Sequence, residues 1–533
     1  MMAYMSISLR KLFFVLLACL SGLYLLSFYG HLKNYKVESW VDTLRQGELP
    51  WKLATTVDAY RNSELTAANF KRQQAVREAT SHAWKAYRQF AWGQDELRPV
   101  AKDSNQKWGG WAITLVDSLD TLKLMSLDED YEEAKEFVRT MQFNRTVEGY
   151  HTQLFEMTIR ALGGLLGAYE LDDDPMLLKQ AQVVGDSLAH AFRTADSLPA
   201  PYVDVNGKAL VPGRDICIAE AGTLQLEFKK LSQLTGNDTY AKLVDNVSEI
   251  LERAERKFKG LYPSFINVLT GEFNPHSAIT VGAYADSFYE YLLKQYILHA
   301  GKEPKFKARY ITSVEAIKEN LLKKSTTGFS YIGLMASETN FVHEMEHLAC
   351  FYPGLLALGS RVLDRPQDLE VAKELARTCY HSYTMTPTGL GPDVISFDLQ
   401  EPIPTRDVYA QRLWDAKHYD ADGIGAAATR YILRPETIET LFILYRITGD
   451  PKYQEWGWNI FLAIEKHAKI EHGYSGLVDV YDTTADAPRL DSMESFFLAE
   501  TLKYLYLLFS PTDLLSLDEF VLNTEAHPLR IMK

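Results

Sequence analysis

Two glutamates near the start of one predicted helix are the clearest residues for chemistry in this chain. Residues 434–449 read Arg-Pro-Glu-Thr-Ile-Glu-Thr-Leu-Phe-Ile-Leu-Tyr-Arg-Ile-Thr-Gly, which places Glu436 and Glu439 three residues apart. Pro435 suits the first turn of a helix, and Gly449 suits the position just past its end. Both carboxylates therefore lie on one face, beside the positive end of the helix dipole. Taken alone they are explained by capping, because acids are common at helix starts.

The same design recurs in other predicted helices, which changes its interpretation. Seven helices that are apolar on nearly all sides begin near Trp111, Leu154, Ile218, Ala283, Glu346, Arg434 and Met493. Most of them carry a carboxylate in the first turn or two, namely Glu156, Glu220, Asp286, Glu346, Glu436 and Glu494. Six like charges around one cavity would repel each other, so capping does not explain the whole set. We therefore predict a pocket lined by carboxylates.

The elements that must position these acids are helical hairpins. Each apolar helix is followed by a Gly or Asp turn, such as residues 234–240 or 447–453, and then by an amphipathic helix. Clear alternating strands are scarce. A ring of buried helices enclosed by amphipathic partners is an α/α barrel, and parallel inner helices bring their N-terminal ends together. The pattern predicts an all-α fold with the carboxylates at one end of a helical barrel.

The N-terminus predicts a membrane anchor. Arg10 and Lys11 precede an apolar run, residues 12–28, of about the length that spans a bilayer. A cleaved signal peptide is the alternative, but no clear small-x-small cleavage site follows before His31. The positive-inside rule then places the chain beyond the anchor in the lumen. We predict a cytoplasmic tail and anchor in residues 1–30, a stem in 31–75 and a lumenal catalytic domain in 76–533.

Charge, sequons and cysteines fit a monomeric lumenal protein. The net charge of −14 argues against nucleic acid or an anionic membrane surface as the main partner. Cys19 lies in the predicted anchor, and the other three of the four cysteines allow one disulfide and one free thiol. N-glycosylation is predicted at the sequons that begin with Asn144, Asn237 and Asn246.

A pocket of acids has two main uses when the sequence shows neither a Ser or Cys nucleophile signature nor zinc spacing. One is binding of a hard cation through oxygen, and the other is hydrolysis by paired carboxylates, as in glycoside cleavage. A sugar pocket also needs aromatic rings and an arginine, which Trp111, Phe155, Phe496 and Arg434 can provide. Arg160 follows Glu156 by four residues, so a helix ion pair and a pocket contact are both open.

Several of these segments are similar to glycoside hydrolase family 47, the class I α-1,2-mannosidases that trim high-mannose N-glycans. The resemblance runs from about Lys71 to the C-terminus. It implies an (α/α)7 barrel with a C-terminal β-hairpin plug, and an inverting mannosyl-oligosaccharide 1,2-α-mannosidase that depends on one Ca²⁺. The motifs that carry it are Arg434-Pro-Glu-Thr-Ile-Glu, Gly282-Ala-Tyr-Ala-Asp-Ser, Phe155-Glu-Met-Thr-Ile-Arg, His347-Leu-Ala-Cys-Phe and Asn523-Thr-Glu-Ala-His-Pro.

The resemblance also implies roles for single residues. Glu436 matches the general base that acts on a water, Glu156 the candidate general acid, and Asp286 is the rival for that second role. Thr524 matches the only direct protein ligand of Ca²⁺, through its hydroxyl and carbonyl oxygens. Further pocket positions are matched by Arg160, Glu220, His347, Arg434, Glu439, Phe496, Glu500 and Glu525.

Cysteine pairing and branch specificity follow from the same resemblance. Cys350 and Cys379 match the family's disulfide, which leaves Cys217 free. In the endoplasmic-reticulum subgroup, which removes a single mannose, an arginine usually lies two residues before the pocket aspartate. Here that residue is Tyr284. The resemblance therefore leaves open whether the protein acts in the endoplasmic reticulum or the Golgi, and which branch it cuts.

Two other functions compete with this prediction. One is a mannosidase-like lectin of endoplasmic-reticulum-associated degradation that binds glycans with little or no catalysis. That class usually carries further C-terminal domains, whereas this sequence stops soon after Pro528, and each acid that catalysis needs is present. The other is a different α/α-barrel enzyme such as an endoglucanase, against which the Thr524-Glu525 motif argues. We therefore predict a membrane-anchored, Ca²⁺-dependent enzyme of the secretory pathway.

Overall fold

The computed structural model describes residues 49–51, 63–194, 198–204, 208–211, 213–337, 339–397 and 418–533. It divides the chain into a small unit, Met1–Trp51 with Lys533, and a large unit, Lys52–Met532. The predicted anchor and most of the predicted stem lie outside the described residues, and so remain predictions. Among the described residues, no helix is both long and apolar enough to cross a membrane. Among the described residues of the large unit, the first helix is α3, which begins at Ser63, inside the segment predicted as a stem.

In the described part of the large unit, seven buried helices each pack on a helix that is more polar on its outer side. The buried helices are α5 (Leu119–Leu124), α8 (Gly163–Asp172), α11 (Gln225–Thr235), α13 (Asp286–Leu298), α15 (Tyr352–Val362), α18 (Glu436–Thr448) and α20 (Leu502–Leu508). Their partners, in the same order, are α6 (Asp128–Thr140), α9 (Pro175–Ala189), α12 (Thr239–Arg253), α14 (Pro304–Asn320), α16 (Pro366–Thr384), α19 (Lys452–His467) and α3 (Ser63–Phe90). The predicted alternation of apolar and amphipathic helices is confirmed.

Helix α18 follows its sequence signals closely. Pro435 stands at the N-cap, and Gly449 ends the helix with a φ of 70°, its N–H donating to the carbonyl of Tyr445 at 2.8 Å. A positive φ is the conformation for which glycine is suited. All residues of α18 from Glu436 to Ile447 are buried, so its first-turn glutamates lie in the interior as well.

Short strands and helical turns connect the helix pairs, so the all-α prediction holds as a mainly helical fold. The strands are β1 (Glu96–Arg98), β2 (Asp103–Asn105), β3 (Thr152–Gln153), β4 (Tyr202–Val203), β5 (Ala209–Leu210), β6 (Asp215–Cys217), β7 (Phe265–Asn267), β8 (Leu322–Lys324), β9 (Ser330–Ile332), β10 (Leu334–Ser337), β11 (Asn340–Val342), β12 (Glu344–Glu346), β13 (Val394–Phe397), β14 (Ile424–Ala428), β15 (Phe520–Leu522) and β16 (Pro528–Arg530). The shorter helices are α4 (Ile113–Asp117), α7 (Leu154–Glu156), α10 (Ile218–Gly222), the 3₁₀ helices η3 (His190–Phe192) and η4 (His347–Phe351), and the π-helices η2 (Met157–Leu162) and η5 (Phe497–Thr501).

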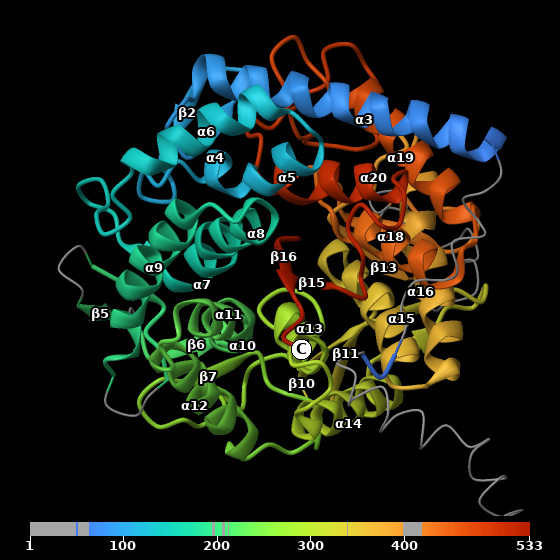
Figure 1. The fold of residues 1–533 in the computed structure, drawn as a ribbon. Helices are drawn as coiled ribbons and strands as arrows, with labels where there is room; N and C mark the ends of the chain where they lie inside the picture. The colour runs from blue at the N-terminus through green and yellow to red at the C-terminus, as the bar shows by residue number, and fades with distance from the viewer. Residues whose placement is uncertain are drawn as a thin grey trace, which may run out of the picture. The chain divides into compact units, whose positions relative to one another are not determined.

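The C-terminal β-hairpin, drawn in red in Figure 1, lies among the buried helices. Strands β15 and β16 are antiparallel, with Phe520 opposite Arg530 and Leu522 opposite Pro528. Strand β16 packs on α8, and β15 on α13. The turn between the strands is hydrogen-bonded to four of the buried helices, through Asp120 of α5, Glu227 of α11, Lys294 of α13 and Lys503 of α20. The interior therefore fixes the position of this turn.

The cysteines and sequons are placed as follows. A disulfide joins Cys350 of η4 to Cys379 of α16, as the resemblance implies, and Cys217 is a buried free thiol. Cross-linking two elements that far apart in the chain restricts the unfolded state and so stabilises the fold. N-glycosylation stays a prediction, and the side chains it concerns are exposed at Asn144, Asn237 and Asn246.

Candidate active site

The residues predicted for catalysis and binding, except His347, line one cavity of about 350 Å³. It lies where the first turns of α10, α13 and α18 and the π-helices after Glu156 and Phe496 meet the turn of the hairpin. Four of the six acids of the predicted helix starts thus come together, namely Glu156, Glu220, Asp286 and Glu436. The predicted residues in its wall are Glu156, Arg160, Glu220, Asp286, Arg434, Glu436, Glu439, Phe496, Glu500, Thr524 and Glu525.

Two of the six helix-start acids do not belong to this wall, so the prediction was wrong for them. Glu346 ends strand β12, and its carboxylate accepts the N–H of Ala283 at 2.6 Å. Glu494 pairs with Lys107 at 2.6 Å. The carboxylate of Glu346 thus binds the backbone, and that of Glu494 binds a neighbouring side chain. The position of an acid in the sequence does not distinguish such a structural role from a role in the pocket.

Glu436 is held as an ionised carboxylate. Nδ1 of the buried His347 donates to it at 2.7 Å, and Arg434 approaches it at 3.5 Å. His347 contacts Tyr383 through its other nitrogen at 2.7 Å, so it acts from behind Glu436 and does not line the cavity. Burial favours the neutral acid, but Arg434 and His347 outweigh it and hold the pKa of Glu436 below its ordinary value. A group that is ionised at neutral pH can accept a proton from water.

The other acids on the floor of the cavity are crowded. Burial, with charge from Glu290 among others, raises the pKa of Asp286 to about 7 and that of Glu439 to about 8. Burial and the neighbouring carboxylates also raise the pKa of Glu500 and of Glu525 well above the ordinary value. Like charges that are held together away from water disfavour ionisation. At neutral pH, these acids must either remain protonated or be neutralised by a cation.

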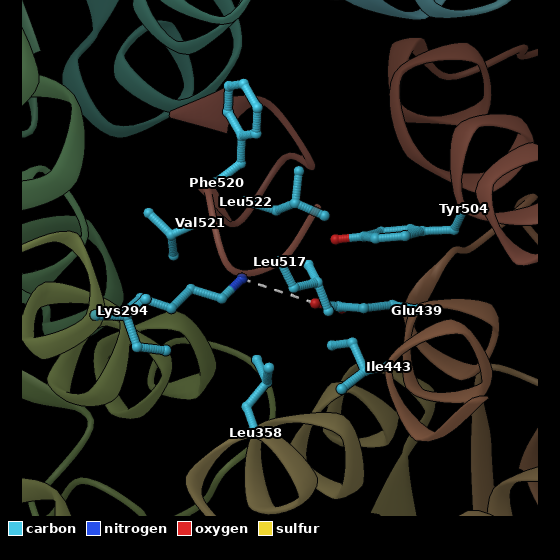
Figure 2. Close-up of a pocket in the computed structure, with 10 residues that line it drawn as sticks. Lys294, Leu358, Glu439, Ile443, Tyr504, Leu517, Phe520, Val521 and Leu522 are labelled. Atoms are coloured by element: carbon cyan, nitrogen blue, oxygen red, sulfur yellow. Dashed lines mark ion pairs between the residues drawn. The ribbon is translucent and has the colours of Figure 1, made fainter. Parts of the chain in front are cut away.

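One cation of the chain already lies under this floor. Figure 2 shows Lys294 in a small cavity of about 20 Å³, next to Glu439 and the apolar side chains of the hairpin. Its ammonium group lies 3.8 Å from Glu439, and it also pairs with Glu290. Lys294 therefore offsets part of the negative charge of the cavity acids, and it does so without occupying the main cavity.

Two π-helical segments shape the wall, and helical periodicity does not predict them. The segment Met157–Leu162 follows Glu156 and contains Arg160, and Phe497–Thr501 follows Phe496 and contains Glu500. A π-turn adds a residue to the helix and is frequent at functional sites. Arg160 makes the predicted helix ion pair, at 2.7 Å to Glu156, and it also lines the cavity. Both interpretations of Arg160 therefore apply.

Sequence reasoning missed one acid of the wall and could have found it. Glu290 lines the cavity one helical turn after Asp286, on the same face of α13. The spacing of four residues was visible in the sequence. Tyr284, which replaces the subgroup arginine, lies in the same wall with 59% of its surface exposed. Its φ is 72°, and its ring packs against Phe265 at 5.1 Å.

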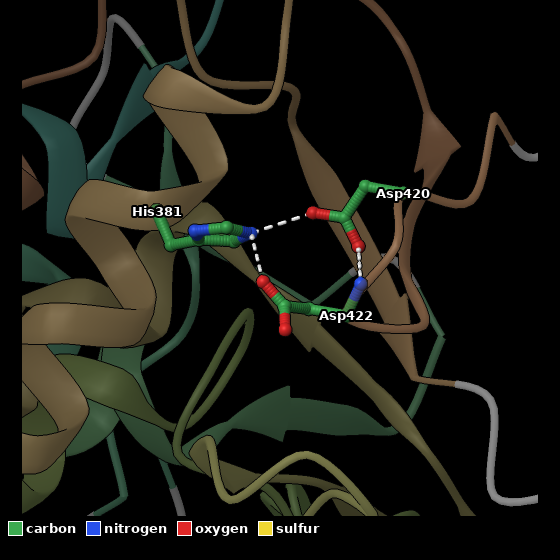
Figure 3. Close-up of side chains that lie close together, drawn as sticks. All are labelled: His381, Asp420 and Asp422. Atoms are coloured by element: carbon green, nitrogen blue, oxygen red, sulfur yellow. Dashed lines mark hydrogen bonds and ion pairs between the residues drawn. The ribbon is translucent and has the colours of Figure 1, made fainter.

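A second group of metal-type ligands lies outside this cavity. His381, Asp420 and Asp422, shown in Figure 3, have ligand atoms within 4.8 Å of one another. One oxygen of Asp420 accepts the N–H groups of Asp422 and Ile424, and the other contacts His381 at 2.6 Å. One oxygen of Asp420 thus closes the loop itself, and the other connects the loop to His381 of α16. We assign this cluster to the structure of the loop before β14.

Comparison with known proteins agrees with the fold. Residues 79–531 match the model of glycosyl hydrolase family 47. The chain is 42% identical over 467 residues to the human endoplasmic reticulum mannosyl-oligosaccharide 1,2-alpha-mannosidase, covering 86% of this chain and 64% of that protein. It is 43% identical over 476 residues to a mannosyl-oligosaccharide 1,2-alpha-mannosidase of Arabidopsis thaliana, covering 87% and 79%.

A solved structure extends this agreement to the backbone. The alpha-1,2-mannosidase from Trichoderma reesei superposes with a TM-score of 0.81 at 31% identity, covering 87% of this chain and 99% of that one. The human relative is the longer protein, since this chain spans just under two thirds of its length. The match of most of the chain, the mainly helical fold and the cavity of acids lead to one conclusion. The chain belongs to glycosyl hydrolase family 47.

Proposed function

We propose that this protein hydrolyses terminal α-1,2-linked mannose of high-mannose N-glycans, with inversion at the anomeric carbon. The observation that carries the proposal is the ionised Glu436 in a cavity that also holds Glu156 and Asp286, each on a different helical element. Inversion needs a base and an acid on opposite sides of the sugar, with room for a water. The protein is thus a mannosyl-oligosaccharide 1,2-α-mannosidase that trims N-glycans.

The scaffold we propose is an (α/α)7 barrel with the hairpin as its plug. Seven pairs of buried and outer helices support it, from α5 with α6 to α20 with α3 (Figure 1). The hairpin contacts the buried layer and leaves the cavity on the side of the helix N-termini. Their backbone N–H groups give this end of the barrel a positive potential that helps to hold carboxylates.

Glu436 acts as the general base. It takes a proton from the water that attacks the anomeric carbon, while His347 and Arg434 hold its carboxylate in place. Phe496 offers an aromatic face to the apolar side of a sugar, with the Arg160 guanidinium 5.8 Å from its ring centre. The polar groups of the wall then bind hydroxyls of the sugar, namely Arg160, Glu220, Arg434, Glu439, Glu500 and Glu525.

Two carboxyls compete for the role of proton donor to the leaving oxygen. Family similarity favours Glu156, and the raised pKa of Asp286 keeps a proton available near neutral pH. α-Mannosyl fluoride separates them, because fluoride departs without a proton. We expect one of Glu156→Gln and Asp286→Asn to lose about 10²–10⁴-fold in kcat on glycan and to keep most of its fluoride hydrolysis. If neither variant is rescued by the fluoride, a direct donor role is excluded for both.

The cavity suits a calcium ion. Thr524 lies in a wall rich in carboxylates, and its hydroxyl and carbonyl oxygens are the ligands that family similarity implies. An all-oxygen set with many waters is what Ca²⁺ accepts. The acids whose pKa values are raised carry the charge that such an ion would offset. Thr524 would hold the ion, with Glu439, Glu500 and Glu525 around it. When bound, calcium would order hydroxyls of the sugar and neutralise part of this charge.

The setting we propose is the lumen of the endoplasmic reticulum or Golgi, with the N-terminal segment as a type II anchor and glycoproteins as partners. One assay tests the activity and the branch specificity together. The lumenal part is incubated with a Man9 glycan with and without Ca²⁺, and the products are identified by mass and by anomeric configuration. We expect β-mannose and a shorter glycan only with Ca²⁺. Binding of glycan without any release would instead identify a lectin.

A further inference from the structure

The turn that carries Thr524 is closed by its own side chains. Oδ1 of the buried Asn523 accepts the N–H groups of Glu525 at 2.9 Å and of His527 at 2.8 Å. Its amide donates to the carbonyl of Ile159 at 3.0 Å, so the turn is fastened to the π-helix beside Glu156. The orientation of Thr524 is therefore set by Asn523, which does not itself line the cavity.

Among the contacts that hold this turn, the ion pairs of His527 are the strongest. It is completely buried, and its two ring nitrogens lie 2.8 Å from Asp120 and 2.9 Å from Asp117. Both nitrogens donate in this arrangement, which makes the ring a cation between two carboxylates. Gly163 makes room for it, because a Cβ there would lie 2.8 Å from the ring. The helix α8 is thus fitted to this ion pair.

Asp117 uses its second oxygen on the opposite side. It accepts the hydroxyl of Ser495 at 2.5 Å, and Ser495 in turn accepts an N–H of Arg160 at 3.1 Å. Arg160 then donates to Glu156 at 2.7 Å. Asp117 and Ser495 are both fully buried, and neither lines the cavity. Asp117 thus takes part in two chains of hydrogen bonds. One of them leads to the turn with Thr524, and the other leads to Glu156.

We propose that Asp117 is a positioning residue that fixes both sides of the active site. Through His527 it orients the turn with Thr524, and through Ser495 and Arg160 it orients Glu156. The proposal rests on the proposed function, since it assigns Thr524 to calcium and Glu156 to catalysis. A buried charge whose partners are themselves charged holds its neighbours in one geometry, and its removal leaves them uncompensated.

Three variants separate the two arms. Ser495→Ala removes the hydroxyl that bridges Asp117 to Arg160 and leaves the direct ion pair between these two residues at 3.6 Å, so it weakens only the arm to Arg160 and Glu156. His527→Asn keeps a donor for Asp120 and loses the one for Asp117, so it breaks only the arm to Thr524. Asp117→Asn breaks both. For each, the Kd of Ca²⁺ is measured by calorimetry and kcat is measured on Man9 glycan at saturating Ca²⁺.

We expect a different pattern from each variant. Ser495→Ala lowers kcat by about tenfold and leaves the Kd of Ca²⁺ within twofold, as the loss of one charge-assisted bond predicts. His527→Asn raises the Kd by about tenfold with kcat within threefold. Asp117→Asn changes both by at least these factors. The Kd is a readout that a loss of catalytic groups alone would not move.

Asp368→Asn is the matched control. Asp368 is also completely buried and pairs with Lys318 and with Arg365, the latter at 2.6 Å, on the outer helix α16. It should lose stability like Asp117→Asn and keep both kcat and Kd. The proposal is overturned if Asp117→Asn changes neither quantity, or if Asp368→Asn changes both as strongly.

The proposal can still be tested if some of the variants fail to fold. If Asp117→Asn and His527→Asn do not fold, an unchanged kcat of the mild Ser495→Ala variant still overturns the proposal, because it removes the arm through Ser495 that the proposal requires. Failure of the proposed function is recognised separately, because the unmodified protein would then neither cleave Man9 glycan nor bind Ca²⁺.

Discussion

Replacement of Glu436 by glutamine is expected to lower kcat on a high-mannose glycan by about 10²–10⁴-fold, the usual contribution of a general base. The amide keeps the size of the side chain and cannot take a proton from water. His347, at 2.7 Å, can still donate to the amide oxygen, so the local geometry should be retained. Glycan binding should therefore change far less than turnover. Both are measured on the same preparation, by single-turnover kinetics and by equilibrium binding.

The matched control for this substitution is Glu455→Gln. Glu455 also lies in the first turn of a helix, α19, the partner that packs on α18, and its ion pair is with Arg72 outside the cavity. Because exposed ion pairs contribute about 0–1 kcal/mol, this variant should keep nearly full turnover. Full turnover by Glu436→Gln itself would remove the base assignment.

The sequence predicted two features well. These are the buried helices and the end at which their carboxylates come together. Both follow from local rules, since apolar residues at helical spacing bury a face and Pro435 and Gly449 limit α18. The meeting of Glu436 with Asp286 follows from the parallel direction of the inner helices. Local rules do not say which acid turns inward, which is why Glu346 was predicted in the wall and Glu290 was not.

Other parts of the site depend on contacts between distant segments. The position of Thr524 depends on a turn fastened to α5, α11, α13 and α20, so only family similarity identified it in the sequence. The π-helices arise where a regular helix is interrupted, and hydrophobic periodicity carries no signal for the extra residue. The role of Asp117 required atomic distances, because its partners are about 380 to 410 residues away in sequence.

Removal of calcium is expected to abolish activity and to destabilise the protein more at pH 8 than at pH 5. An ion at 100 times its Kd stabilises a fold by about 2.7 kcal/mol. Without it, the crowded acids of the floor must ionise unaided as the pH rises. Burial, with charge from neighbouring carboxylates, raises the pKa of Asp286 to about 7 and that of Glu439 to about 8.

The sign of this pH dependence follows from proton binding. Between the ordinary carboxyl pKa near 4 and the raised values, the folded state holds more protons than the unfolded state, so the stability of the ion-free form falls as the pH rises through 7 to 8. Bound calcium removes most of this dependence, because its charge lets the same acids ionise. The measurement is the midpoint of thermal unfolding with Ca²⁺ and with EDTA at pH 5 and pH 8. A Thr524→Val variant, which loses one of the proposed ligand oxygens, should show a smaller difference between the two conditions at pH 8. An equal effect of EDTA at both pH values would mean that the acids of the cavity do not carry the charge that calcium offsets.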